Sequence, residues 1–354
     1  MRFGRLQKRA SLTLVLLGMI AAARLPMSCL AYAADSATRY HVSQRWPLAG
    51  AGGWNFIFVS DHNHRLYVPR DTRITVVDTN TGLPVAEIKG LTDARGIALD
   101  PEDNVAYVTD GITGTLKVFS LSTLNLTSSV TTGGAPEAVV FEPTTRHIFT
   151  FDTHTNAALV IDPSSFQITQ RIKLPGRPTG ASVDGKGSVF VNLESTSQVA
   201  RIDARTFKLQ ETISLAPCVG PSGIALDLKR SYVFSTCENK MMAVTDGSNG
   251  KLVATIPVGE GAKTVAFDER DELVFSANAD GTLSVIKEDA PARFIPVQTV
   301  ATEPGARIMT FDSDRQQLYL LSSKFGQRTE PTSEELQFRP TPVPGSAVVL
   351  VIKP

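Results

Sequence analysis

The chain has 354 residues, of which 42% are hydrophobic and 20% are charged, a composition typical of a folded globular protein. Its 35 basic and 35 acidic residues balance. The overall charge therefore lacks the excess of basic residues that sequence-independent binding to nucleic acid or to an anionic membrane requires.

Residues 1–34 have the pattern of a secretory signal peptide. Four basic side chains among residues 2–9 precede an apolar stretch at 12–23 that is too short to span a bilayer comfortably, and Ala31-Tyr32-Ala33 is a small-x-small cleavage signal. An uncleaved anchor, or a lipid anchor at Cys29, is the alternative. We predict a mature periplasmic or secreted protein, residues 35–354, without a transmembrane segment. Cleavage removes five bases and no acids, which leaves 30 bases against 35 acids and makes nucleic acid a still less suitable partner.

Seven copies of one pattern follow the leader. In each copy an apolar run closes with a polar residue, an acid in six of the seven, and after a short polar turn a strand carries an aromatic residue. These aromatic residues are Tyr67, Tyr107, Phe149, Phe190, Phe234, Phe275 and Tyr319. A repeat of about forty residues is one supersecondary unit that must stack on its neighbours to bury its apolar face.

Each copy contains four short runs with strand character. In the second copy they are residues 96–100, 105–109, 115–120 and 126–132, separated by turn residues and rich in β-branched and aromatic side chains. Four antiparallel strands repeated seven times predict an all-β fold, a seven-bladed β-propeller formed as a single domain. A straight β-solenoid is the competing repeat architecture.

The two ends of the chain complement each other. The seventh copy stops at Pro354 without a fourth strand, whereas residues 41–48 precede the first complete copy and resemble the fourth strands 168–174 and 252–258. We predict that this N-terminal strand closes the last blade and so removes exposed sheet edges. A frayed N-terminal segment is the alternative.

The last copy also carries an insertion at residues 324–346 between its second and third strands, with four prolines. Long loops of this kind are functional or disordered, and the sequence leaves both possibilities open.

Several stretches resemble a known family. Leu66-Tyr67-Val68, Val76-Val77-Asp78, Thr81-Gly82 and Thr255-Ile256-Pro257-Val258-Gly259 resemble the repeat of the YVTN and YncE-like bacterial seven-bladed propellers, and residues 239–244, 279–283 and 344–346 resemble an exported YncE-like subgroup. The resemblance spans roughly residues 40–354 and departs from the family pattern at Ser60 and Arg70. It implies the fold more than a function, since the family is mostly without assigned chemistry. Some relatives are linked with DNA binding, which the acidic mature chain does not support.

The residues that lead into the innermost strands should surround one end of a central channel. By register they are Asn55, Arg95, Glu137, Thr179, Ser222, Lys263 and Arg307. Three cations against one acid would create a positive potential at a narrow opening. We predict a site for a small anionic ligand there; a hydrated ring neutralised by neighbouring loops is the alternative.

Polar residues also follow the second strands on the same face. They are Arg70, Asp71, Asp110, Asp152, His154, Glu194, Glu238 and Asp280. Calcium would need six to eight oxygens from several of these loops, and no short run collects them. Glu137, Asp152 and His154 form the one cluster to examine for acid–base or metal chemistry.

Cys218 and Cys237 remain after removal of the leader, and register places both on this face of the fifth blade. An oxidising compartment favours a disulfide between them; free thiols are the alternative. The remaining histidines indicate no metal site.

Taken together, these features predict an exported, monomeric and non-catalytic propeller that binds a small ligand or an envelope protein, without a cofactor or metal. A propeller enzyme, lactonase-like or quinoprotein-like, and an envelope interaction scaffold are the alternatives.

Overall fold

The structure is a computed structural model that describes residues 39–50, 52–53, 56–60, 63–328 and 340–354. The predicted signal peptide and Asn55 lie outside the described residues. Residues Thr38–Pro354 form one compact unit. The described part is built from strands, with one short 3-10 turn, η1 (Glu194–Thr196), and no α-helix.

Five sheets have four antiparallel strands each, and four of these five follow the chain from one strand to the next. Their strands are β8 (Pro136–Glu142), β9 (His147–Asp152), β10 (Ala157–Ile161) and β11 (Ile168–Lys173); β12 (Pro178–Val183), β13 (Ser188–Leu193), β14 (Gln198–Asp203) and β15 (Lys208–Ser214); β16 (Pro221–Asp227), β17 (Tyr232–Cys237), β18 (Met241–Asp246) and β19 (Lys251–Pro257); β20 (Thr264–Asp268), β21 (Leu273–Asn278), β22 (Thr282–Ala290) and β23 (Arg293–Ala301).

The fifth sheet joins the two ends of the described chain. It contains β24 (Ile308–Asp312), β25 (Gln317–Ser322), β28 (Val348–Lys353) and, as its outermost strand, β1 (His41–Pro47). The pairing of β1 with β28 runs from His41 opposite Lys353 to Pro47 opposite Val348. The predicted closure by the N-terminal strand is therefore confirmed.

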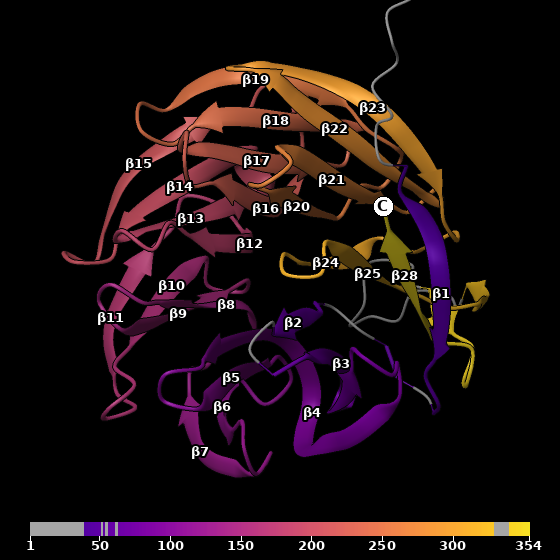
Figure 1. The fold of residues 1–354 in the computed structure, drawn as a ribbon. Coiled ribbons are helices and arrows are strands. Elements are labelled where there is room, and N and C mark those ends of the chain that lie inside the picture. The colour runs from indigo at the N-terminus through magenta and orange to yellow at the C-terminus, as the bar shows by residue number, and fades with distance from the viewer. Residues whose placement is uncertain (1–38, 51, 54–55, 61–62, 329–339) are drawn as a thin grey trace, which may run out of the picture. The chain divides into compact units, whose positions relative to one another are not determined.

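The sheets surround a central axis as the blades of a β-propeller (Figure 1). Strands β2, β8, β12, β16, β20 and β24 lie innermost, and β1, β7, β11, β15, β19 and β23 lie outermost. The aromatic residues of the repeat are all buried, at most 5% exposed, between neighbouring sheets. They form the apolar contacts that make the repeats stack.

The predicted number of seven blades is wrong, because the structure has six. The first two sequence repeats share one six-stranded sheet made of β2 (Phe58–Ser60), β3 (Arg65–Asp78), β4 (Pro84–Asp100), β5 (Val105–Asp110), β6 (Thr115–Ser120) and β7 (Leu126–Thr131). Strand β4 runs without interruption from the outer strand of the first repeat into the inner strand of the second. A further pairing of Asp71 with Ala94 joins the two halves. Tyr67 and Val108 from opposite halves still pack in one core cluster, so the long sheet folds over on itself.

The acid that closes each inner strand has a local structural role. Asp227 accepts hydrogen bonds from the backbone N–H groups of Lys229 and Arg230 at 2.8 and 3.0 Å, and Glu142 accepts from Thr144 and Thr145 at 3.2 and 2.7 Å. Such side-chain acceptors replace backbone partners in tight turns. The repeated acid is therefore explained by the turn that follows each inner strand.

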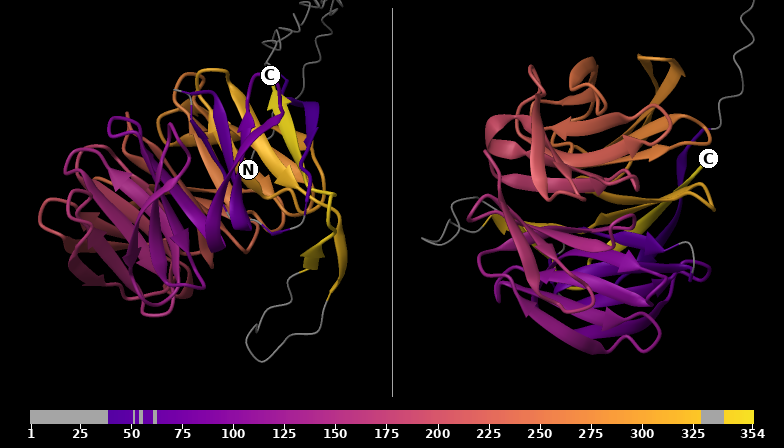
Figure 2. Two further views of the ribbon diagram at one scale, coloured as in Figure 1. Left: turned by 90° about the horizontal axis from the view of Figure 1, so that it is seen from below. Right: turned by 90° about the vertical axis from the view of Figure 1, so that its left-hand side faces the viewer.

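The insertion of the last repeat is partly a hairpin. Strands β26 (Phe325–Arg328) and β27 (Pro340–Pro342) pair with each other and extend away from the blades (Figure 2). Ser346 Oγ accepts a hydrogen bond from the backbone N–H of Lys324 at 3.1 Å and ties the base of this hairpin. Residues 329–339 of the predicted loop lie outside the described residues.

Candidate functional site

The residues that precede the inner strands line one end of the central channel, which we call the mouth. Among the described residues they are Arg95, Glu137, Thr179, Ser222, Lys263 and Arg307, from β4 and β8 and from the loops or first residues at β12, β16, β20 and β24. Figure 1 shows these inner strands converging on the axis.

Arg95 is neutralised by carboxylates. Its Nε lies 2.7 Å from Asp93 Oδ2 and its Nη1 lies 3.8 Å from Glu137 Oε2. All three side chains are about one-fifth exposed, at 22%, 17% and 16%. Partial burial strengthens such pairs relative to exposed ones. Arg95 and Glu137 therefore compensate each other across neighbouring sheets, with Asp93 as an additional partner.

Thr179 and Ser222 join one inner strand to the next. Thr179 Oγ1 donates to the backbone carbonyl oxygen of Pro221 at 3.0 Å, and Ser222 Oγ donates to that of Lys263 at 3.2 Å. Both side chains are buried. Their hydroxyl protons are thus used inside the scaffold, and the structure explains these two residues without a ligand.

Lys263 differs from its neighbours at the mouth. Its side chain is half-buried and makes no ion pair or side-chain hydrogen bond with any residue that the structure describes. Burial lowers the pKa of Lys263 below its usual value. Glu137 and Glu194 raise this pKa and Arg307 and Arg177 lower it, although these residues belong to three other blades. The amine therefore lies where charges from across the channel reach it.

The loops contribute a second ion pair that the sequence did not predict. Arg177 Nη1 lies 3.0 Å from Glu194 Oε2. With Asp93, Arg177 and Glu194 included, the mouth holds four cations and three acids. The ring positions themselves keep three cations and one acid, and with the loop residues included the formal excess among these described residues is a single positive charge. Asp93 and Arg177 each stand two residues before a predicted mouth position, which is the signal that could have identified them.

The aspartates of the neighbouring loops support the backbone. Asp110 Oδ2 accepts from the N–H of Thr92 at 2.7 Å, Asp152 Oδ1 from that of Ala135 at 3.0 Å and Asp280 Oδ2 from that of Glu260 at 2.8 Å. Each aspartate follows a second strand and ties down the loop that enters the innermost strand of the same repeat. The structure thus gives these aspartates, which were expected to neutralise the charge of the mouth, a role in holding the backbone of their loops.

Both carboxylate oxygens of Asp152 accept hydrogen bonds from nearby loop residues. Its two oxygens accept from the N–H groups of Ala135 and His154 and from the Thr155 hydroxyl, at 3.0, 2.9 and 2.6 Å. Burial alone would raise the pKa of Asp152, but these hydrogen bonds outweigh it and the pKa is lowered. His154 itself is exposed. Among the described residues no group of three His, Cys, Asp or Glu side chains is arranged to hold a metal ion, and the cluster of Glu137, Asp152 and His154 is not one.

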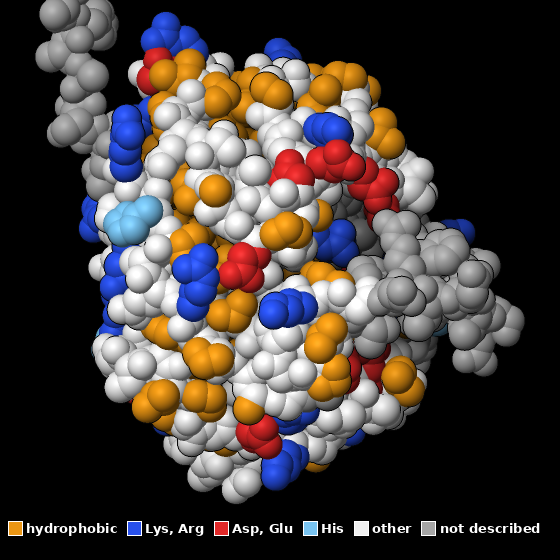
Figure 3. Space-filling view, turned by 90° about the vertical axis from the view of Figure 1, so that its right-hand side faces the viewer, with side chains coloured by type: hydrophobic (Ala, Val, Ile, Leu, Met, Phe, Trp, Pro, Cys, Tyr) orange, Lys and Arg blue, Asp and Glu red, His pale blue; other side chains and the backbone are white. Residues whose placement is uncertain are grey.

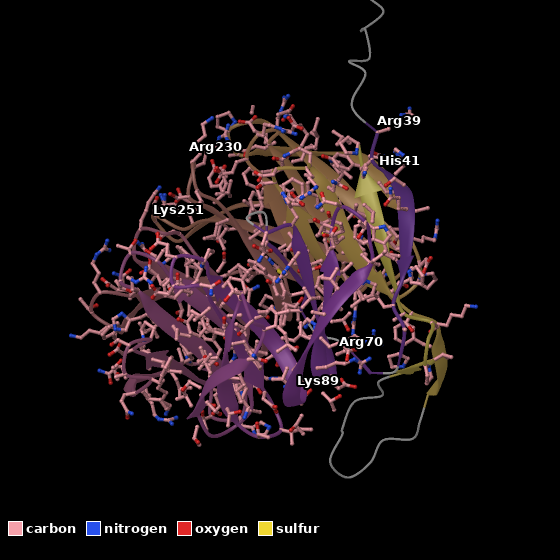
Figure 4. The ribbon with its side chains drawn as sticks, turned by 60° about the horizontal axis from the view of Figure 1, so that its bottom comes forward. Arg39, His41, Arg70, Lys89, Arg230 and Lys251 are labelled. Atoms are coloured by element: carbon pink, nitrogen blue, oxygen red, sulfur yellow. A yellow bond between two sulfur atoms is a disulfide. The ribbon has the colours of Figure 1, made fainter. Side chains whose placement is uncertain are left out.

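Arg70 is buried in the first repeat. It is the largest fully buried side chain, 1% exposed, and its Nη2 donates to the carbonyl oxygen of Gly50 at 3.1 Å. Burial lowers the pKa of this guanidinium. Figure 4 shows Arg70 on the side of the molecule that carries the hairpin β26–β27 and far from Arg230. We assign it to the packing of the first repeat.

Cys218 and Cys237 form the predicted disulfide, with their Cα atoms 5.7 Å apart. Both residues are buried. The bond joins the loop before β16 to the end of β17, next to the mouth. The same loop is held by a hydrogen bond of 3.1 Å from the N–H of Val219 to Asn239 Oδ1.

Beneath the mouth the inner strands enclose a cavity of about 440 Å³, which we call the shaft. Its wall includes Phe58 of β2 and one apolar residue from each of β4, β8, β12, β16, β20 and β24: Ile97, Val139, Ala181, Ile224, Val265 and Met309. The first wall positions are Gly96, Ala138, Gly180, Gly223 and Thr264, each directly after a mouth residue. The mouth and the shaft are therefore adjoining parts of one channel.

Glycine at these positions lets the inner strands approach each other. A Cβ on Gly96 would lie 2.5 Å from the carbonyl oxygen of Glu137, and one on Gly223 would lie 2.6 Å from that of Lys263. Distances under 3.0 Å would force the strands apart. The close approach at the top of the shaft thus depends on the absence of side chains.

Comparisons with known proteins identify the fold. The chain is similar to the solved structure of U3-55K, with a TM-score of 0.73, 10% sequence identity and coverage of 88% of this chain and 99% of the other. It is also similar to the WD40 repeats of RRP9, with a TM-score of 0.74, 10% identity and coverage of 89% and 100%. No protein-family model and no curated protein matches the chain. The likeness shows the β-propeller fold.

The surface on one side of the molecule carries side chains of mixed type. On the side of the molecule that carries β1, basic, acidic and apolar side chains are interspersed (Figure 3). Among the described residues no helix is long and apolar enough to cross a membrane.

Proposed function

We propose that this chain is an exported, non-catalytic β-propeller that binds a small anion at the mouth, where the ammonium group of Lys263 holds the ligand. One observation carries the proposal. Lys263 is a half-buried cation without a partner among the described residues, whereas Arg95 and Arg177 are both ion-paired. A charge withdrawn from water is costly unless it is paired. A ligand with negative charge would supply the missing partner.

The surrounding residues support binding rather than a reaction. The aspartates of this face are occupied by backbone N–H groups, and the hydroxyls of Thr179 and Ser222 by carbonyl oxygens. General acid–base catalysis needs a group that is free to exchange a proton with the substrate. The described residues therefore favour a binding site.

The test compares two lysine variants of the chain without residues 1–34. Isothermal titration calorimetry with acetate, phosphate and sulfate would measure anion binding to the wild type, to Lys263→Met and to Lys240→Met. Lys240 is the matched control because it lies on the same face, is 60% exposed and is already paired with Glu260 at 2.8 Å.

Truncating one member of a buried charge pair costs about 2–5 kcal/mol. We therefore expect Lys263→Met to weaken anion binding at least about thirtyfold, with Lys240→Met unchanged. Equal affinities for the two variants would contradict the proposal, as would a wild type that binds none of the three anions.

A second measurement follows from the lowered pKa of Lys263. A bound anion stabilises the charged amine, so the pKa rises on binding and the complex takes up protons. Affinity should increase as the pH falls from the alkaline side. The charged groups that act on this amine from the other blades are Glu137, Glu194, Arg177 and Arg307. Calorimetry in two buffers of different ionisation enthalpy would detect the proton uptake; identical heats in both buffers would argue against Lys263 as the ligand.

Export and membership of the YncE-like group are parts of the same proposal, supported by the pattern of residues 1–34 and by the repeat motifs. Expression of the full chain in a bacterium, followed by fractionation and N-terminal sequencing, tests export. We expect a periplasmic or secreted protein that begins near residue 35. A cytoplasmic protein that retains Met1 would exclude it.

A second candidate function is a protein-interaction scaffold, favoured by exposed apolar side chains on the loops of the mouth face. Ile112, Val219 and Val343 are 70%, 54% and 40% exposed. Exposed apolar side chains can mark a protein interface. Crosslinking in cells followed by mass spectrometry would identify a partner. It should be lost on Ile112→Asp with Val219→Asp and retained on Lys263→Met; the reverse result would favour the anion site.

A further inference from the structure

Below Lys263 the channel changes from polar to apolar. Lys263 directly precedes Thr264, which belongs to the shaft wall together with Ile97, Val139, Ile224 and Met309. The wall residues of β4 run from Gly96 to Leu99, which corresponds to roughly 10 Å of strand at about 3.3 Å per residue. An occupant of the whole channel would therefore meet a charge at one end and a wall more apolar than polar along its length.

The size of the shaft is suitable for a ligand. Its volume of about 440 Å³ lies within the range of small-molecule sites, which are mostly apolar with a few placed polar groups. Wall residues from β2, β4, β8, β12, β16, β20 and β24 surround the axis, so a body inside the shaft would be covered around its circumference. Burial of apolar surface on this scale favours a ligand with a hydrocarbon body.

The charge of the mouth limits the head group. The arginine forks of Arg95 and Arg177, which would otherwise bind a phosphate or sulfate through two parallel hydrogen bonds, already pair with Asp93 and Glu194. Lys263 offers a single compact charge, and the mouth as a whole has one formal positive charge in excess. One carboxylate matches this charge, whereas a dianion would leave a negative charge uncompensated.

We infer that the channel binds an aliphatic monocarboxylate, with its carboxylate at Lys263 and its hydrocarbon chain in the shaft. This inference rests on the proposed anion site and adds the class of ligand. The apolar wall supplies most of the affinity and Lys263 fixes the orientation. The natural ligand would then be an amphipathic acid rather than an inorganic anion.

A homologous series of carboxylates tests the inference. Acetate, butanoate, hexanoate and octanoate would be titrated into the chain without residues 1–34 by calorimetry. Each buried methylene contributes about 0.8 kcal/mol, which corresponds to an about fourfold lower Kd per carbon. We expect Kd to fall about fifteenfold for each pair of carbons while the shaft has room.

Two variants separate the head from the chain. Ala181→Phe fills the shaft and should abolish the dependence on chain length while acetate still binds; Lys263→Met should weaken every member of the series by the same factor. Because a variant with a filled shaft can fail to fold, octanol and octylammonium titrated into the wild type provide a second measurement. Both should bind at least about thirtyfold more weakly than octanoate.

The outcomes distinguish the two proposals. A Kd that stays the same from acetate to octanoate overturns the inference but leaves the anion site intact. Octylammonium or octanol binding as tightly as octanoate excludes Lys263 as the partner of the head group. If no carboxylate binds, the inference fails; if phosphate and sulfate do not bind either, the proposed anion site fails as well.

Discussion

Replacing Trp46 by alanine tests whether the N-terminal strand holds the ring together. Trp46 lies on β1, is 8% exposed and stacks with Tyr319 at a ring-centroid distance of 5.4 Å. It also belongs to a core cluster with Leu66 and Val68 of β3, so one side chain connects the last sheet to the first. A buried aromatic residue of this size covers about 150–250 Å², and at about 25 cal/mol per Å² its loss costs roughly 4–6 kcal/mol.

Truncations of buried tryptophan elsewhere cost about 3–5 kcal/mol, so we expect Trp46→Ala to lower the free energy of unfolding by about 4 kcal/mol. At about 2–4 °C per kcal/mol, this loss lowers the Tm by roughly 8–16 °C. The shift per kcal/mol decreases with size, so for a unit of this size we expect a fall in Tm of about 8 °C. Urea unfolding followed by circular dichroism, with a parallel thermal scan, measures both quantities.

The control for this experiment is Ile112→Ala. Ile112 is 70% exposed, and surface truncations of this kind usually change stability by less than about 0.5 kcal/mol. If Trp46→Ala stays within about 1 kcal/mol of the wild type and the urea dependence is unchanged, β1 does not close the last sheet in solution and the reasoning is refuted.

Three further changes test other parts of the structure. Replacing Cys218 and Cys237 by serine removes a crosslink across 19 positions and should cost about 3 kcal/mol in urea unfolding without reductant; equal stability would contradict the bond. Gly180→Ala directs a Cβ at the carbonyl oxygen of Ser222. It should cost about 1–3 kcal/mol by the same assay, and a neutral result would exclude the close approach of the inner strands. Asp152 has a lowered pKa, so its contribution is present above the usual aspartate value of about 3.9 and is lost as the pH falls through the folded value. The difference in free energy of unfolding between the wild type and Asp152→Asn should be largest at neutral pH and decrease below about pH 4. A difference that does not depend on pH would argue against a charged Asp152.

The repeat period predicted most of the fold because it reports which residues must be buried together. Tyr67, Tyr107 and the other aromatic residues of the column are all buried, and the strands of the second copy end within one residue of the predicted positions except at the start of β4. The number of sheets was wrong for a physical reason. Whether residues 84–100 form two strands or one depends on hydrogen bonds such as the pairing of Asp71 with Ala94, and a repeat column carries no information about pairing between copies.

The candidate site was predicted in position but not in charge balance. Register placed Arg95, Glu137 and Lys263 at one end of the channel, because a mouth position depends only on the start of each inner strand. Pairing depends on how far side chains reach between loops, so Asp93 and Arg177 were missed. The structural role of the loop aspartates was not predicted, because the sequence does not distinguish a carboxylate that accepts hydrogen bonds from backbone N–H groups from one that binds a ligand.

The contrast among the mouth residues indicates which position the scaffold alone does not explain. At two mouth positions a small hydroxyl side chain, Thr179 or Ser222, joins adjacent inner strands at no cost in charge. A lysine at the same position loses hydration, as its lowered pKa shows, and its ammonium group donates to no described residue. A hydroxyl side chain at this position would join the inner strands without placing a charge in a partly buried site. The scaffold alone therefore does not explain Lys263, and a partner outside the described residues would compensate its charge. A ligand that enters the apolar shaft with a carboxylate facing Lys263 would do so, and its affinity would then depend on both the charge and the length of the chain.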